Sequence, residues 1–245
     1  MTIHYLQPNW PSLSGVNALI TTRQGGVSSG PFAQLNLSNY VGDNAEAVAQ
    51  NRALLRTLLP AEPIWLRQTH SNTVIDAARP HKHAPEADAS FSRQPGVVCA
   101  VLTADCLPVL LVDQEATTVA AVHAGWRGLA KGILENTVAA LAIAPQRLLA
   151  YLGPAIGPKA FEVDEEVRAT FIAHQPHASE AFTASPVEGK YLGNLYFLAQ
   201  QRLQSAGVKH IFGGQYCTFN DSQHFYSFRR EAQCGRMASL IWLSA

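Results

Sequence analysis

TADCLPVLLVDQEATTVAAVHAGWRG, residues 103–128, contains two nearly continuous apolar runs joined by a few polar residues. The runs, 107–113 and 117–124, have the length of β-strands, and an apolar run without alternation predicts a strand that is buried on both faces. A short connection between two strands favours an antiparallel hairpin. We therefore expect this hairpin to lie in the interior of a β-sheet.

The register of this hairpin determines which side chains share a face. A turn centred between Gln114 and Glu115 places Cys106 directly opposite His123, and opposed residues have Cβ atoms about 4.5–5.5 Å apart. A shift of one residue would turn the two side chains to opposite faces, and Gln-Glu is not a favoured tight-turn pair. In the centred register, the thiol and the imidazole are neighbours at the open end of the hairpin.

The segment after His123 predicts an anion site. AGWRG, residues 124–128, leads directly into a predicted helix, and a helix start bordered by glycine exposes backbone N–H groups at the positive end of the helix dipole. Arg127 adds a planar, permanently charged guanidinium that suits phosphate or carboxylate. The alternative for Arg127 is an ordinary surface role, with its stem packed and its charge paired with a carboxylate.

His70 is the third candidate site residue. It lies in the polar segment RQTHSN, between two predicted strand segments of residues 63–76. Two imidazoles and a thiolate suit zinc or copper, and three protein ligands leave a fourth position open, as in catalytic zinc sites. The spacing along the chain does not show whether His70 reaches the hairpin, and a buried cysteine commonly acts as a small hydrophobic residue without chemistry.

Two aspartates near these residues have open roles. Asp105 precedes the cysteine, where it either orients a histidine or holds a turn. Asp88, in the segment EADAS, is expected to cap or turn the chain. Neither residue has a sequence pattern that fixes its role.

The rest of the chain mixes strands and helices without a strict βαβ order, which predicts an α/β (α+β) fold of mixed β-sheets flanked by helices. No linker-like segment divides the chain, so residues 1–245 are expected to form a single domain. Further strands are expected at 17–23, 96–103, 147–153, 208–214 and 236–243, and helices at 42–60, 129–144, from 164 onward and at 194–207.

Composition excludes several classes of protein. The 18 basic and 18 acidic residues cancel and no basic run is present, which argues against a nucleic-acid-binding protein. No apolar run reaches membrane-spanning length, and the N-terminus lacks the pattern of a secretory signal, so we expect a cytoplasmic protein that does not bind membranes. None of the four cysteines forms a CxxC pair, and in a reducing cytosol they are expected to be free thiols.

Several motifs together resemble those of the YfiH/laccase-domain family, whose members have been described as polyphenol oxidases, purine nucleoside phosphorylases and peptidoglycan editing factors. The motifs extend from about residue 15 to the C-terminus. They are RQTHSN, EADAS, TADCLPVLL, AAVHAGWRG, LGPAIGPKAFEV and CTFND…FYSFRRE…CGRMASLIWL.

This resemblance implies a single domain of mixed sheets flanked by helices. It also implies a metal site formed by His70, Cys106 and His123, with zinc as the metal and copper as the alternative. The activities it implies are phosphorolysis of adenosine, inosine and methylthioadenosine to the free base and ribose 1-phosphate, together with adenosine deamination. The expected small-molecule partners are a nucleoside and phosphate, and the sequence identifies no partner protein.

Four functions follow from these observations. The first is a zinc-dependent purine nucleoside enzyme in which Arg127 holds phosphate; the zinc-deaminase signature H-x-E…P-C-x-x-C is absent. The second is a cysteine amidase of peptidoglycan precursor editing, with Cys106 as nucleophile and His123 as its base. The third is a copper polyphenol oxidase, although nine histidines with one HxH pair are too few for a four-copper laccase. The fourth is a metal-binding protein without catalysis.

Overall fold

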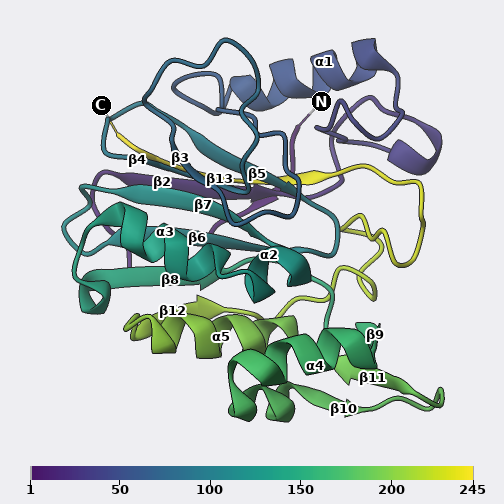
Figure 1. The fold of residues 1–245 in the computed structure, drawn as a ribbon. Helices are drawn as coiled ribbons and strands as arrows, with labels where there is room; N and C mark the ends of the chain where they lie inside the picture. Colours follow the sequence, from purple (N-terminus) through teal and green to yellow (C-terminus); the bar gives the residue numbers. More distant parts are fainter. Residues whose placement is uncertain (1, 245) are drawn as a thin grey trace.

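The computed structural model describes residues 2–244, which form four layers (Figure 1). The predicted hairpin, β6 (Leu107–Asp113) and β7 (Val119–Ala124), lies in the middle of a six-stranded sheet, and every residue of both strands is buried. The strand order of this sheet is β12 (His210–Gly213), β8 (Leu148–Leu152), β6, β7, β4 (Ala89–Ser92) and β3 (Val74–Asp76).

One face of this sheet packs on a second, four-stranded sheet. Its strand order is β1 (Tyr5–Leu6), β2 (Val16–Thr21), β13 (Met237–Leu243) and β5 (Cys99–Thr103). Because successive side chains of a strand alternate between faces, Leu110 and Val112 of β6 point into the core between the two sheets. Val109 and Leu111 point to the opposite face, where helices cover the sheet.

Helices cover both outer faces of this pair of sheets (Figure 1). On the six-stranded sheet the cover is α2 (Trp126–Ala130), α3 (Ile133–Leu141) and α5 (Leu195–Ser205). On the four-stranded sheet it is α1 (Ala45–Arg56), which begins where the Asn44 side chain accepts a hydrogen bond from the backbone N–H of Ala47. A small third sheet, of β10 (Phe182–Ala184), β11 (Lys190–Gly193) and β9 (Glu162–Asp164), packs with α4 (Glu165–His174). The predicted mixed α/β class is confirmed.

The predicted register of the hairpin was wrong by two residues. His123 lies opposite Pro108, not Cys106, because the connecting loop is centred one residue further along the chain. The Asp113 carboxylate accepts hydrogen bonds from the backbone N–H groups of Thr117 and Thr118 and holds this loop in place. A shift of two residues preserves the face, so Cys106 still lies on the His123 side of the sheet.

Two local predictions also need correction. The helix predicted over 129–144 begins earlier, at Trp126, and is interrupted at Gly132, whose φ of +87° separates α2 from α3. Of the two strand segments predicted within 63–76, only β3 forms a strand, while Ile64 and Arg67 make isolated bridges. His70 lies in the intervening loop. Within residues 2–244, no helix has the length and apolarity needed to cross a bilayer.

Candidate metal centre and its pocket

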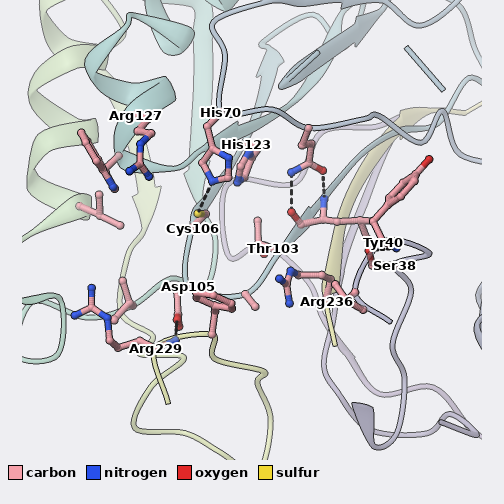
Figure 2. Close-up of a pocket in the computed structure, with 18 of the residues that line it drawn as sticks. Ser38, Tyr40, His70, Thr103, Asp105, Cys106, His123, Arg127, Arg229 and Arg236 are labelled. Atoms are coloured by element: carbon pink, nitrogen blue, oxygen red, sulfur yellow. Dashed lines mark hydrogen bonds between the residues drawn. The ribbon is translucent and has the colours of Figure 1, made fainter. Parts of the chain in front are cut away.

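The three predicted ligand residues meet at one point. His70 comes from the loop before β3, Cys106 directly precedes β6, and His123 lies near the end of β7. Their potential ligand atoms all lie within 4.8 Å of one another, and His70 Nε2 is 3.7 Å from the Cys106 Sγ atom (Figure 2). Two imidazole nitrogens and a thiol sulfur are a donor set that zinc and copper accept, so these residues fit a metal ion.

Gly125 allows this approach. A Cβ atom at this position would lie 2.9 Å from the Cys106 Sγ atom and 2.9 Å from the His70 Cδ2 atom. Both distances are shorter than van der Waals contact, so no larger residue fits between the two side chains. The glycine of the AGWRG segment therefore matters for packing at the metal site as well as for the start of α2.

One buried carboxylate positions both histidines. Asp88 accepts a hydrogen bond from His123 Nδ1 at 2.7 Å, which fixes the ring orientation and leaves Nε2 for a metal. It also accepts hydrogen bonds from the backbone N–H groups of His70, at 3.0 Å, and Ser71, at 2.6 Å. These bonds hold the loop in which His70 has a φ of +57°. The sequence predicted that Asp88 caps or turns the chain but did not reveal its contact with His123.

Asp105 takes the second of its two predicted roles. Its carboxylate accepts hydrogen bonds from the Thr218 hydroxyl, at 2.6 Å, and from the backbone N–H of Arg229, at 2.7 Å. Asp105 has a φ of +82°, so the chain turns sharply immediately before Cys106. Asp105 therefore joins this turn to the C-terminal loops and does not orient a histidine.

The site favours charge separation between its thiol and its imidazole. Burial alone would raise the pKa of the Cys106 thiol, but the charge of His123 and hydrogen bonds from His123 and His70 lower that pKa to about 6. Burial alone would lower the pKa of His123, but the Cys106 charge and the Asp88 hydrogen bond raise it to about 9. Burial opposes ionisation of Asp88 as well, yet its hydrogen bonds hold its pKa well below the ordinary range. The lowered pKa favours the thiolate form of Cys106, which is the form that binds a metal.

The three ligand residues line a cavity of about 550 Å³, a volume suited to a small molecule (Figure 2). Three arginines, Arg127, Arg229 and Arg236, also line it, and none of them forms an ion pair with a carboxylate of residues 2–244. Apolar side chains complete the wall: Leu66, Leu102, Ile156, Phe161, Leu195 and Phe228. The cavity is therefore positively charged and partly apolar.

Arg127 lines this cavity with its guanidinium 4.4 Å from the centre of the Trp126 ring. The helix it belongs to, α2, is only five residues long. A helix of this length aligns few peptide dipoles, so the guanidinium groups supply most of the positive charge here. The sequence did not reveal Arg229 and Arg236 as part of the site. Their only signals were the segments FRRE and CGRM, which do not indicate which residues of the chain they will face.

Most of the chain matches one protein family. The family model described as multi-copper polyphenol oxidoreductase laccase matches residues 17–244. The chain belongs to this family. The resemblance seen in the sequence is thereby confirmed.

Relatives in this family are named for a nucleoside activity. The chain is 50% identical over 238 residues to purine nucleoside phosphorylase YfiH of Escherichia coli, covering 96% of this chain and 97% of that protein. It is 48% identical over 240 residues to purine nucleoside phosphorylase of Haemophilus influenzae, covering 97% and 98%.

Solved structures share the fold. A Neisseria meningitidis protein, 48% identical, superposes with a TM-score of 0.94 over 98% of this chain and 99% of that one. YlmD from Geobacillus stearothermophilus, 31% identical, superposes with a TM-score of 0.92 over 98% and 96%. At these identities the likeness extends beyond the fold, and the relatives' names identify this protein as an enzyme.

The metal centre itself differs from what the family's descriptive name implies. Within residues 2–244, the donor atoms of potential metal ligands converge in one group, which consists of His70, Cys106 and His123. A multi-copper oxidase needs several such groups close together. Three side chains that could share one ion instead resemble a catalytic mononuclear site with one position open.

Proposed function

We propose that the protein is a zinc-dependent purine nucleoside phosphorylase. It would cleave adenosine, inosine and methylthioadenosine with phosphate, giving the free base and a ribose 1-phosphate. The observation that carries the proposal is that one cavity holds both the metal ligands and three arginines without carboxylate partners. The names of the relatives in Escherichia coli and Haemophilus influenzae support it.

Phosphate would lie between Arg127 and Arg229. Figure 2 shows both arginines on the same side of Cys106. The Arg229 Nη1 atom donates to the backbone oxygen of Glu162 at 2.9 Å, which holds the guanidinium in place and leaves its other nitrogens for a ligand. Planar guanidinium groups bind phosphate oxygens bidentately, and two of them would offset most of the phosphate charge.

In phosphorolysis, a phosphate oxygen attacks the anomeric carbon of ribose while the bond from that carbon to the purine nitrogen breaks. The electron pair of the broken bond goes to the purine. Zinc bound by His70, Cys106 and His123 would act as a Lewis acid on the substrate in this cavity. The apolar wall, including Leu102 and Ile156, keeps water from competing with phosphate for the anomeric carbon.

Zinc rather than copper is the metal we propose, with copper as the alternative. A thiolate with two imidazoles is found in catalytic zinc sites with an open fourth position. Adenosine deamination would be a second reaction of the same cavity. No carboxylate of the zinc-deaminase signature is present to act as its general base, so the sequence offers no candidate for that role.

A cysteine amidase is the second candidate function, favoured by one observation. The lowered pKa of Cys106 and the raised pKa of His123 describe a thiolate–imidazolium pair, which is the activated form of a cysteine nucleophile. A metal on the thiolate would block this chemistry. An amidase would therefore be inactivated by an alkylating reagent only after chelation, whereas a zinc phosphorylase would lose activity on chelation itself.

We further propose that the protein works in the cytoplasm on small molecules, without nucleic acid or membrane partners. Its four free cysteines suit a reducing compartment.

The proposal is tested by purifying the protein without added copper and measuring bound metal by mass spectrometry. Adenosine and inosine are then assayed with and without phosphate, in the wild type and in Cys106→Ala and His123→Ala. We expect zinc, phosphate-dependent release of ribose 1-phosphate, and loss of this release in both variants. Base release that needs neither phosphate nor these residues would rule the proposal out.

A further inference from the structure

Arg236 is held in place by one of its three guanidinium nitrogens. Its Nη1 atom donates to the backbone oxygens of Cys234, at 2.8 Å, and Gly235, at 3.0 Å. The backbone N–H of Arg236 donates to the Asn36 side chain at 3.0 Å, and its backbone oxygen accepts from Leu37 at 3.3 Å. Within residues 2–244, the Nε and Nη2 atoms have no hydrogen-bond partner. These two atoms form one edge of the guanidinium, so a bidentate donor is fixed in position and unused.

Arg236 lies on the opposite side of Cys106 from the proposed phosphate position (Figure 2). In Figure 2, Cys106 lies between Arg236 on one side and Arg127 and Arg229 on the other, and the Arg236 guanidinium points into the space between them. The half-exposed Phe228 ring lies with its centre 5.8 Å from the Arg236 guanidinium carbon. The Arg236 side of the cavity therefore combines an aromatic face with two parallel N–H donors.

That combination matches the edge of a 6-oxopurine. The O6 and N7 atoms of guanine and hypoxanthine are two neighbouring acceptors, and an arginine donates to both at once. Adenine has the same N7 acceptor but carries an amino group at position 6, which is a donor and repels the second N–H. An aromatic side chain can stack on the base face.

Resting on the proposed function, we propose that Arg236 binds the O6 and N7 atoms of the purine and gives the enzyme a preference for 6-oxopurine nucleosides over adenosine. Phosphate on the Arg127 side and the base on the Arg236 side would place the ribose between them, next to the metal ligands. When the bond to the anomeric carbon breaks, the electron pair delocalises over the purine, including N7 and O6. The Arg236 N–H groups donate hydrogen bonds to the atoms that carry this charge and so stabilise it.

The experiment compares the wild type with Arg236→Gln and Arg236→Lys, and uses Arg67→Gln as control because Arg67 lies on the surface paired with Glu86. Equilibrium binding of inosine, adenosine and 7-deazainosine is measured without phosphate, and kcat/KM for inosine and adenosine with phosphate. For Arg236→Gln we expect inosine binding and kcat/KM to fall roughly ten- to hundredfold, the usual discrimination of one bidentate pair. Adenosine should change less than about threefold, since it makes at most one of the two bonds.

The wild type alone provides a second test that does not depend on the folding of a variant. It should bind inosine more tightly than 7-deazainosine, which lacks the N7 acceptor, and Arg236→Lys should lose most of this difference while keeping its charge. An equal loss for inosine and adenosine with a raised KM for phosphate would overturn the inference and make Arg236 a phosphate ligand. The inference would also be overturned if the wild type cleaves both nucleosides and the Arg236 variants keep its ratio of kcat/KM for inosine to kcat/KM for adenosine. A wild type that neither binds nor cleaves nucleosides would instead overturn the proposed function.

Discussion

His123 and Asp88 form a buried hydrogen bond at the candidate metal centre, with 2.7 Å between Nδ1 and a carboxylate oxygen. β4 and β7 are adjacent antiparallel strands, and Asp88 immediately precedes β4. Its carboxylate therefore lies next to the His123 imidazole across the strand pair. The backbone oxygen of Asp88 also accepts from the backbone N–H of His123 at 2.7 Å. Because the carboxylate binds the His70 loop as well, one side chain sets the geometry of two ligands.

Replacing Asp88 should therefore lower the affinity for zinc more than it lowers the stability of the folded protein. In Asp88→Asn we expect zinc affinity to fall roughly 10- to 100-fold, the usual effect of removing a carboxylate that orients a histidine ligand. The measurement is competition for zinc with a chromophoric chelator, supported by visible spectra of the cobalt-substituted protein. Asp76→Asn is the matched control, since Asp76 accepts a backbone N–H in a turn away from the cavity. Equal zinc affinity in Asp88→Asn and wild type would contradict an orienting role.

The pKa of Cys106 predicts the pH dependence of its reactivity. In metal-free protein we expect the thiolate absorbance near 240 nm, and the rate of alkylation, to rise with a midpoint near pH 6. A lowered pKa means that the charged form persists to lower pH, so the midpoint lies below that of the same cysteine in urea, about 8.5. Cys106→Ser provides the baseline. The buried Cys99 does not interfere, because burial raises its pKa to about 12.

In Asp88→Asn the Cys106 midpoint should move upward, because a neutral side chain supports the positive charge of His123 less well. Alkylation of metal-free wild-type protein that begins only above pH 8 would show that no thiolate–imidazolium pair exists.

Gly125→Ala tests the close packing at the centre. The added methyl group would lie 2.9 Å from the Cys106 Sγ atom and from the His70 Cδ2 atom, so the ligands must separate. We expect zinc to be lost on dialysis and phosphorolysis to fall below detection, with a far-UV spectrum like that of the wild type. Gly189→Ala is the control for backbone strain alone: an alanine is strained at the φ of +75° found there, but the added methyl group meets no atom within 4 Å, so zinc retention should stay as in the wild type. Full zinc retention in Gly125→Ala would show that the three side chains do not share one ion.

The sequence predicted those features that depend on local pattern. β6 occupies 107–113 as predicted, because polar residues on both sides of a buried apolar run define where the strand begins and ends. The face shared by Cys106 and His123 was predicted correctly despite the wrong register, because side chains repeat every two residues along a strand. The register itself depends on the Asp113 hydrogen bonds within the loop, which a turn-pair rule does not describe.

The parts of the site that were missed depend on contacts between distant segments. Asp88 reaches His123 only because β4 pairs with β7, and β4 was not predicted as a strand. Arg229 and Arg236 reach the cavity because the chain after β12 loops back, tied by Thr218 and the backbone of Arg229 to Asp105. No spacing in the sequence encodes these contacts, whereas the motif resemblance implied that His70, already a candidate from its own segment, is a metal ligand.

The assignment of phosphate to one side of the cavity predicts a specific kinetic pattern. Arg127→Met and Arg229→Met should each raise the KM for phosphate roughly tenfold or more, as expected for loss of a charge-assisted hydrogen bond worth about 1.5–3 kcal/mol. Inosine binding without phosphate should change little, because these arginines face Cys106 from the side opposite Arg236. Arg147→Met is a suitable control, since its partner Glu115 is an exposed residue of the β6–β7 loop.

The double variant separates this assignment from a general electrostatic effect. If both guanidinium groups hold one phosphate, their losses should combine non-additively, because the second removal acts on a phosphate that has already lost its fixed position. A general loss of positive potential would instead lower inosine and phosphate binding alike and would diminish steadily with added salt. A raised KM for inosine with an unchanged KM for phosphate would reverse the assignment, placing the base beside Arg127 and phosphate beside Arg236.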